Sequence, residues 1–200
     1  MKKIKCLFAL TLAFTGSFMS CKNGSEMSKD INTKEEEIIC ETTSNKTETS
    51  TSGKITFSST DLNGVILTDE IFSKNKITML NIWATFCWPC IEEMPDLAKL
   101  NDEYKEKSFE VVGIPFDIVD NKGNLINEKK ENFDLIIPYT GANYKHIIPT
   151  LDMMNGMLKD IQAVPTTIFV DSTGKQIGEA YVGSRSLEEW HKIVDELLKN

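Results

Sequence analysis

The chain has 200 residues, and its formal net charge at pH 7 is −8. Hydrophobic residues make up 40% of it, which suits one domain with a sizeable core plus appended segments. The acidic balance argues against nucleic acid as a partner and against a basic patch for anionic lipid, and by itself it selects no other partner.

Residues 1–20 have the order of a secretory signal. Lys2, Lys3 and Lys5 precede an apolar stretch, and small, turn-prone residues follow it. A membrane-spanning helix needs about 20 apolar residues, so this stretch is short, and removal is favoured over a retained membrane anchor. We therefore predict that residues 1–20 are a signal peptide.

Cys21 follows this signal directly, and the junction resembles the processing site of a bacterial lipoprotein. Ser20 fits the residue expected before the lipid-bearing cysteine, whereas Phe18 stands where Leu is usual. We expect lipid attachment at Cys21. The alternative is ordinary signal cleavage that leaves Cys21 as an incidental thiol, in which case a disulfide with Cys40 or a linked dimer becomes plausible.

Residues 21–53 are rich in Ser, Thr, Glu, Lys and Asn and contain one short apolar patch. Such a segment cannot bury enough apolar surface to offset the entropy that ordering would cost. We predict a disordered tether that lifts the following domain, residues 54–200, off a membrane.

The domain begins with a pattern that predicts a short strand and a hairpin, with Asn63-Gly64 as the turn. Residues 77–83 are almost continuously apolar, as expected for a strand that is covered on both faces. Residues 90–107 have largely helical spacing of apolar side chains, although Pro95 should kink such a helix.

Further strands are expected at residues 109–117 and 164–171, and residues 175–183 predict a hairpin partner for the second of these. Residues 118–160 give weaker signals of a helix, a short strand and a second helix at residues 152–161. An amphipathic helix closes the chain, with Ser186 in its capping box. Strands that alternate with helices indicate an α/β fold with a central mixed sheet.

Cys87 and Cys90 lie where a buried strand ends and a helix begins. A helix N-terminus offers partial positive charge and free N–H groups, so we expect a lowered pKa for the Cys87 thiol. Cys90 lies one turn further in, within reach of Cys87 but more covered, and Pro89 suits the first helical turn. This asymmetry predicts that Cys87 attacks a substrate disulfide and that Cys90 resolves the mixed disulfide.

Three other uses of a Cys-x-x-Cys pattern fit less well. A zinc site needs four ligands, and Cys40, His146 and His191 supply no second pair, so no metal is expected. Covalent haem attachment needs His after the second cysteine, where Ile91 stands. A purely structural disulfide stays open in an oxidising compartment, but its tiny loop would restrict the unfolded chain little.

Residues 77–97, together with residues 164–174 and 181–183, resemble the extracytoplasmic thioredoxin-like proteins of the TlpA/ResA group. The resemblance covers residues 54–200. It implies a thioredoxin-like α/β fold, with a central mixed β-sheet flanked by helices, in a membrane-tethered thiol–disulfide oxidoreductase. It also implies no cofactor beyond the redox-active disulfide.

The same resemblance implies partners and a location. Disulfides of exported proteins would be the substrates, and a membrane redox protein would be the electron donor. The protein would lie in the bacterial cell envelope, outside the cytoplasm, anchored by its N-terminal lipid. Two alternatives stay open: an oxidase that donates its disulfide, which would use the same residues, and a thioredoxin-fold binding module without turnover.

By this resemblance, Cys87 and Cys90 match the redox pair of the group. Val164 and Pro165 match its cis-proline loop, whose backbone can pair with a substrate strand beside the cysteines. The alternative for Pro165 is an ordinary trans proline at the start of a strand.

Glu93 matches an acidic residue found beside the active site in this group. It could help to deprotonate Cys90 if burial raises its pKa, and the alternative is a solvated carboxylate on the helix surface. Asn81 stands where cytoplasmic thioredoxins carry a buried Asp, which leaves any acid–base role to Glu93.

Trp88 and Pro89, between the two cysteines, are predicted to contact substrate. Three positions depart from the common pattern of the group. Phe86 stands where Trp is common, Trp88 stands where Gly or Glu is frequent, and Ile91 replaces a common basic residue. These departures leave the reduction potential and the choice of partner open.

Overall fold

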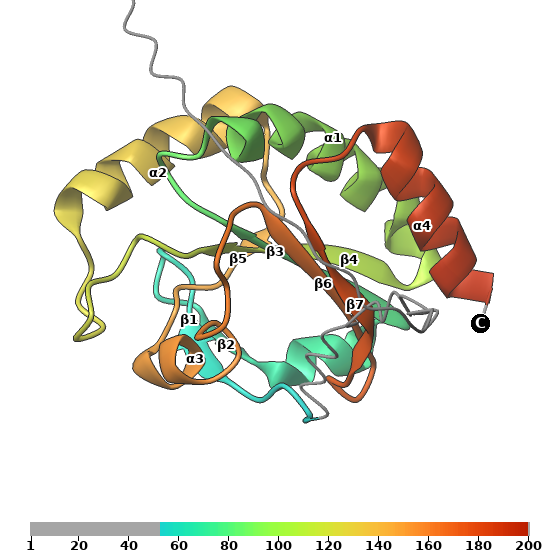
Figure 1. Ribbon diagram of the computed structural model, residues 1–200, viewed down its shortest axis with the longest axis horizontal. Helices are drawn as coiled ribbons and strands as arrows, with labels where there is room; N and C mark the ends of the chain where they lie inside the picture. Colours follow the sequence, from blue (N-terminus) through green and yellow to red (C-terminus); the bar gives the residue numbers. More distant parts are fainter. Residues whose placement is uncertain (1–52, 200) are drawn as a thin grey trace, which may run out of the picture. The chain divides into compact units, whose positions relative to one another are not determined.

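The computed structural model describes residues 53–199, which are drawn in colour in Figure 1. The predicted signal peptide, the predicted lipid site at Cys21 and Cys40 lie outside the described residues, as does all but the last residue of the predicted tether. Within residues 53–199, no helix combines the length and the apolar character needed to cross a membrane.

The described elements alternate between strands and helices. In chain order they are β1 (Ser58–Thr60), β2 (Ile66–Thr68), the 3-10 helix η1 (Asp69–Lys74), β3 (Ile77–Trp83), α1 (Trp88–Tyr104), the 3-10 helix η2 (Lys105–Lys107), β4 (Phe109–Pro115), α2 (Asn127–Thr140), β5 (Lys145–His146), α3 (Leu151–Asn155), β6 (Thr166–Asp171), β7 (Gln176–Val182) and α4 (Leu187–Lys199).

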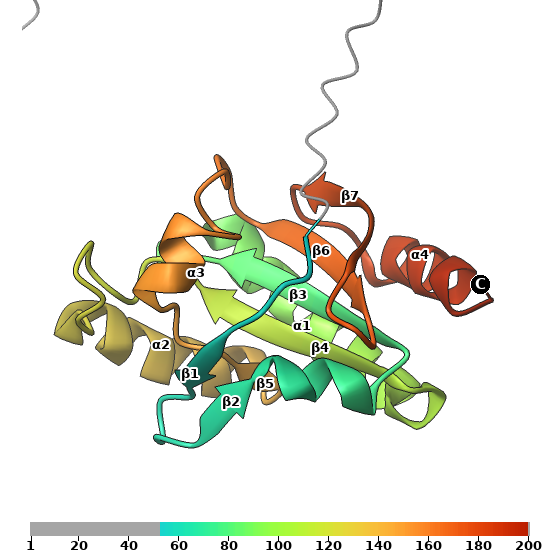
Figure 2. The same ribbon diagram turned by 90° about the horizontal axis from the view of Figure 1, so that it is seen from below.

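Five strands form one mixed sheet in the order β5-β4-β3-β6-β7. The central strand β3 runs parallel to β4 and antiparallel to β6, and all of its residues are buried. Helices α1, α2 and α4 cover one face of the sheet, and η1, α3 and the β1-β2 hairpin cover the other (Figures 1 and 2). The predicted α/β fold with a central mixed sheet is confirmed.

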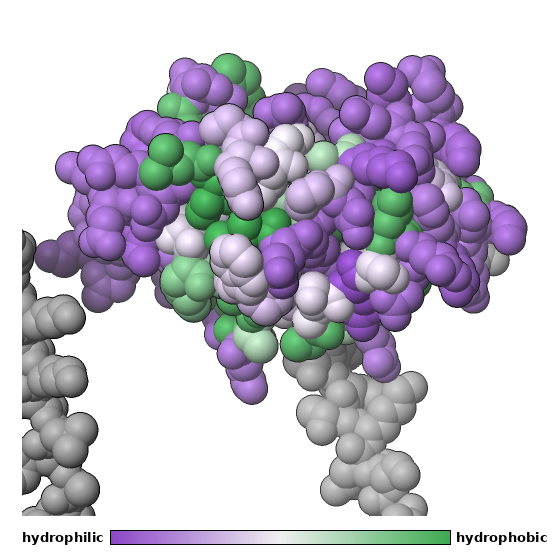
Figure 3. All heavy atoms as spheres, turned by 90° about the horizontal axis from the view of Figure 1, so that it is seen from above, coloured by the Kyte–Doolittle hydropathy of each residue, from purple (hydrophilic) through white to green (hydrophobic). Residues whose placement is uncertain are grey.

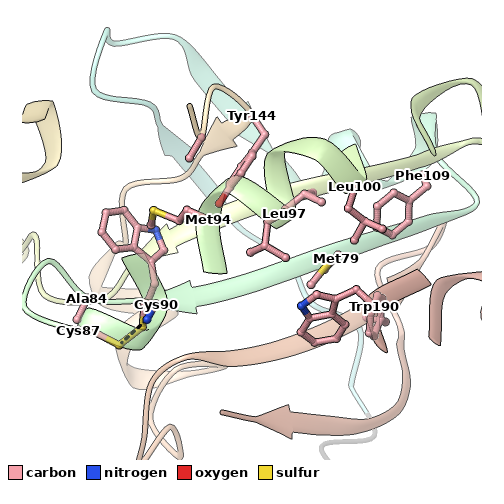
Figure 4. Close-up of a cluster of buried hydrophobic side chains, with 14 of the residues drawn as sticks. Met79, Ala84, Cys87, Cys90, Met94, Leu97, Leu100, Phe109, Tyr144 and Trp190 are labelled. Atoms are coloured by element: carbon pink, nitrogen blue, oxygen red, sulfur yellow. Dashed lines mark hydrogen bonds between the residues drawn. A yellow bond between two sulfur atoms is a disulfide. The ribbon is translucent and has the colours of Figure 1, made fainter. Parts of the chain in front are cut away.

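Side chains of β3 alternate between two cores because successive residues of a strand point to opposite faces. Met79 and Trp83 lie in the core under the helices, and Leu80 and Ile82 lie in the core on the other face. Figure 4 shows the first core, in which α1 contributes Met94, Leu97 and Leu100 and α4 contributes Trp190. Each large side chain buried in this way stabilises the fold by about 1.5–3 kcal/mol.

The predicted hairpin is present, since β1 and β2 pair antiparallel around a tight turn. In this turn Asp61 Oδ1 accepts hydrogen bonds from the backbone N–H groups of Asn63 and Val65, at 2.8 and 2.9 Å. Gly64 has a φ of 81°, a conformation that favours glycine. Further along the chain, α1 (Trp88–Tyr104) continues through Pro95 without a break.

Residues 118–160 contain the predicted helix, short strand and helix, as α2, β5 and α3. The prediction of a second helix over residues 152–161 is right for the start of the helix to within one residue and wrong for its end, because α3 covers only Leu151–Asn155. Thr150 caps its start by accepting a hydrogen bond from Met153 N at 3.3 Å. At its end, Gly156 leaves helical geometry, with φ −103° and ψ −109°.

The predicted capping box at the start of α4 is confirmed. The backbone N–H of Ser186 donates to Glu189 Oε2 at 2.9 Å, and the backbone N–H of Glu189 donates to Ser186 Oγ at 3.4 Å. These two bonds satisfy N–H groups that the helix itself cannot pair. The cap thus fixes where α4 begins.

His146 on β5 is buried among the rings of Trp83, Phe133 and Tyr144. Its Nε2 lies 3.0 Å from the carbonyl oxygen of Ala142, so this nitrogen donates, and its Nδ1 has no partner. Because burial disfavours the charged ring, it lowers the pKa of His146 to about 4.

We expect His146 to destabilise the protein in acid. In the unfolded chain its pKa is about 6.5, so below that pH the unfolded state binds a proton that the folded state refuses until about pH 4. Stability is therefore lost as the pH falls through this window, by up to about 3 kcal/mol. Urea denaturation from pH 4 to 7.5 should show a flatter profile for His146→Phe, which keeps an aromatic ring. Equal slopes for both proteins would contradict the assignment.

Candidate active site

The first cysteine lies at the junction of β3 and α1, as predicted. Cys87 is the N-cap of α1, and the backbone N–H of Cys90 points at Cys87 Sγ, 3.3 Å away (Figure 4). The chain turns into this position through a hydrogen bond from Cys87 N to the carbonyl oxygen of Ala84, at 3.0 Å. The positive end of the helix therefore falls on the sulfur of Cys87.

Cys87 and Cys90 are joined by a disulfide, with their Cα atoms 5.3 Å apart, so the structure shows the oxidised form. Cys87 is 6% exposed and Cys90 is 1% exposed. The predicted pairing and the deeper burial of the second cysteine are thus confirmed. Which sulfur attacks a substrate stays a prediction.

The second segment at the site is the loop before β6. The peptide bond between Val164 and Pro165 is cis, as predicted, and the carbonyl oxygen of Val164 lies 3.5 Å from Cys87 Sγ. The carbonyl oxygen of Pro165 accepts a hydrogen bond from Gly183 N at 2.9 Å, which ties the loop to the end of β7. Backbone polar groups therefore lie directly beside the less buried cysteine.

The residues on either side of Cys87 are exposed aromatic side chains. Phe86 is 71% exposed and Trp88 is 62% exposed, and Pro89 is also exposed. Figure 3 views the side of the molecule that carries the helices, where apolar residues are interspersed with hydrophilic ones. An apolar rim around a barely exposed sulfur suits contact with a polypeptide better than contact with a small ion.

Glu93 is buried one turn after Cys90, so the alternative of a solvated carboxylate is wrong. Its Oε1 accepts hydrogen bonds from the backbone N–H of Arg185 at 2.8 Å and from Trp190 Nε1 at 2.9 Å. Its Oε2 has no partner. Burial raises the pKa of Glu93, although both donors and the charge of Arg185 oppose that rise.

Asn81 is buried at the centre of β3 and donates from Nδ2 to Thr167 Oγ1 on β6, at 3.3 Å. It also favours the charged form of Glu93, and so lowers its pKa slightly. Asn81 is therefore buried at this strand position, and Glu93 is a buried carboxyl one helical turn after Cys90 on α1.

Two sets of contacts were not anticipated from the sequence. Trp190 packs in the core under the helices, and its Nε1 also donates a hydrogen bond to Glu93, 97 residues away in the chain. The second set joins Thr85 to Asp117, with hydrogen bonds from Thr85 N at 2.8 Å and from Thr85 Oγ1 at 2.7 Å. A signal for this set exists, because Thr85 and Asp117 each stand two residues beyond parallel neighbouring strands.

Within residues 53–199, no three or more His, Cys, Asp and Glu side chains lie together in a way that could hold a metal ion. His146 is enclosed by aromatic rings, and His191 pairs with Glu103 on the surface, with Nε2 2.7 Å from Oε2.

Comparison with known proteins gives the family. The sequence profile of the AhpC/TSA family matches residues 54–177. The chain belongs to the AhpC/TSA family. It is 30% identical to the thiol-disulfide oxidoreductase ResA of Oceanobacillus iheyensis over 127 residues. This matched segment covers 62% of this chain and 58% of that protein. It is also 30% identical over 123 residues to the thioredoxin-like protein YneN of Bacillus subtilis. This second match covers 62% of this chain and 66% of YneN. The matched part thus spans about three fifths of the length of these relatives.

Solved structures show the same fold. A thiol:disulfide interchange protein of the thioredoxin family from Chlorobium tepidum TLS is 26% identical, with a TM-score of 0.58 over 72% of this chain and 93% of that one. The thioredoxin domain of a thiol-disulfide oxidoreductase from Bacteroides vulgatus is 20% identical, with a TM-score of 0.57 over 74% and 96%. The predicted thioredoxin-like fold is confirmed.

We expect the raised pKa of Glu93 to make ionisation costly to the fold. The folded state holds the carboxyl proton above the ordinary Glu pKa of about 4.3, so stability falls as the pH rises from there through the folded pKa. Glu93→Gln keeps an oxygen for Arg185 N and Trp190 Nε1 and does not titrate. In urea denaturation at pH 4 to 8, the wild type should lose stability relative to Glu93→Gln as the pH rises. Parallel curves would refute the raised pKa.

Proposed function

We propose that the chain is a membrane-tethered thiol–disulfide oxidoreductase that reduces disulfides of exported proteins outside the cytoplasm. One observation carries the proposal. Cys87 caps α1, is bonded to Cys90, and lies 3.5 Å from the carbonyl oxygen of Val164, next to a cis proline. Relatives named thiol-disulfide oxidoreductase and thiol:disulfide interchange protein support it.

The reaction begins with the reduced pair. The Cys87 thiolate, favoured by the Cys90 N–H group and the helix N-terminus, attacks one sulfur of the substrate disulfide. The substrate S–S bond breaks, and its second sulfur leaves as a thiolate that takes up a proton. Cys90 then loses its proton and attacks Cys87 Sγ, which releases the first substrate sulfur as a thiol. Two electrons pass to the substrate, and the Cys87–Cys90 disulfide is formed.

Glu93 is proposed to receive the proton of Cys90. It lies one helical turn after Cys90 and is buried, and its Oε2 is without a partner. Burial raises the pKa of this carboxyl, and a base with a raised pKa is better matched to proton transfer near neutral pH. The hydrogen bonds from Arg185 N and Trp190 Nε1 would hold the carboxylate in place for this step.

Substrate is proposed to lie across the exposed side of the pair. Trp88 and Pro89 would contact it from the α1 side, and the backbone of Val164 and Pro165 would pair with it from the loop side. The exposure of Trp88 and the 3.5 Å approach of Val164 O to Cys87 Sγ support this arrangement. A chain held there presents its sulfur to Cys87.

A membrane redox protein is proposed as the electron donor that reduces the pair again after each turnover. The proposed location rests on the sequence, namely the signal in residues 1–20, lipid attachment at Cys21, and the tether in residues 21–53 ahead of the domain. Lipid anchoring can be read from the mass of the mature N-terminus.

The roles of the cysteines are tested by insulin reduction. Cys87→Ser should lower turnover to the uncatalysed rate, because no thiolate remains at the helix N-terminus. Cys90→Ser should accumulate a mixed disulfide between Cys87 and the substrate, visible by mass spectrometry without reductant. Turnover that survives Cys87→Ser would sink the assignment of the nucleophile, and an inactive wild type would favour a binding module.

The direction of electron flow is tested by the equilibrium of the Cys87–Cys90 pair with glutathione. A reductant should show a reduction potential well below about −200 mV, whereas a value near about −120 mV would identify an oxidase that donates its disulfide. At each ratio of reduced to oxidised glutathione, thiol labelling measures the fraction of the protein in which the Cys87–Cys90 disulfide is reduced.

A further inference from the structure

The loop that carries Cys87 is fastened to the next strand by one carboxylate. Asp117 accepts a hydrogen bond from Thr85 N at its Oδ1, 2.8 Å away, and one from Thr85 Oγ1 at its Oδ2, 2.7 Å away. Trp83 and Pro115 are opposite each other at the ends of the parallel strands β3 and β4, so Thr85 and Asp117 emerge at the same edge of the sheet. The redox loop is thereby held from two residues before Cys87.

A lysine of α2 completes this contact. Lys129 Nζ lies 3.5 Å from Asp117 Oδ2, and only 12% of the Asp117 side chain is exposed. The same Nζ lies 5.6 Å from the centre of the Phe86 ring, within the range of a cation–π interaction. A single positive charge therefore bridges the carboxylate that holds the loop and the aromatic ring that precedes Cys87. We call the Asp117–Lys129 pair the loop clamp.

The loop clamp gives an exposed ring a defined place. Phe86 is 71% exposed, so few packing contacts restrict it, and Lys129 is a partner on one of its faces. Trp88, which is 62% exposed, follows on the other side of Cys87. Two exposed apolar side chains thus stand next to a cysteine that is itself only 6% exposed.

We propose that Asp117 and Lys129 are positioning residues that orient Phe86 to receive an apolar side chain next to the cysteine of the substrate. This inference rests on the proposed function and names its substrate class: polypeptide disulfides in which an aromatic or aliphatic residue flanks the reacting cysteine. A small charged disulfide such as oxidised glutathione offers no such side chain and gains nothing from the loop clamp.

The test compares two synthetic peptide disulfides, one with Phe beside the cysteine and one with Gly there. Lys129→Met removes the charge and keeps a chain of similar length. It should raise KM for the Phe peptide by at most about two- to fivefold, because the loss in binding cannot exceed what an exposed cation–π contact contributes to holding the ring, and it should leave kcat unchanged. KM for the Gly peptide should change by less than about twofold, because that peptide does not use the ring.

The neighbouring residue supplies a matched control. Lys130 forms an ion pair with Asp134 on the same helix, at 2.6 Å, away from the redox loop. Lys130→Met should therefore change neither KM, and Lys129→Arg, which keeps a cation beside Asp117 and over the ring, should restore the wild-type KM. An equal rise in KM for both peptides, an equal effect of Lys130→Met, or no rescue by Lys129→Arg would overturn the proposal.

A readout without turnover separates this inference from the proposed function. Both peptides, with Ser in place of Cys, can be titrated against the oxidised protein by calorimetry. Wild type should bind the Phe peptide more tightly than the Gly peptide, and Lys129→Met should remove that difference. If the wild type reduces neither peptide, the proposed function fails, and this titration still decides the inference: an unchanged preference in Lys129→Met contradicts it.

Discussion

Full burial of β3 is the constraint on which the site depends. The strand is covered on both faces and paired on both sides, so packing fixes its position in the sheet. The end of β3 at Trp83 is thereby fixed as well, and Cys87 follows four residues later. Helix α1 is held just as firmly, by Met94, Leu97 and Leu100 in the core. The N-terminus of α1 therefore stays on the sulfur of Cys87, and its field acts on that atom without any rearrangement.

Two titratable side chains, Glu93 and His146, are buried in this apolar core, where a charged form is unfavourable. Glu93 Oε2 and His146 Nδ1 each have no partner, and burial keeps both groups in their neutral forms over a wider pH range than in water. Their effects on stability have opposite signs, because a buried acid destabilises the fold when it loses its proton and a buried histidine when it gains one. Glu93 lies beside Cys90, and its cost to the fold is consistent with a role in proton transfer.

Local patterns were sufficient for the elements that form the site. The apolar run of β3, the cysteine at a helix start and the Ser186 capping box each depend on residues close together in sequence, and each was predicted. Contacts between distant segments were not predicted. Trp190 donates a hydrogen bond to Glu93 across 97 residues, through packing that no local pattern encodes. Thr85 donates to Asp117 across 32 residues, and this contact follows only once β3 is known to pair in parallel with β4. The length of α3 was missed because Gly156 ends it inside an apolar stretch.

We propose that the positive end of α1 makes Cys87 the nucleophile. The most direct test is the rate at which iodoacetamide modifies each cysteine of the reduced protein across a range of pH. Cys87 should react first, with a midpoint below the ordinary thiol pKa of about 8.5, while Cys90 stays protected. A faster reaction at Cys90, or a midpoint for Cys87 at or above that ordinary value, would contradict the account.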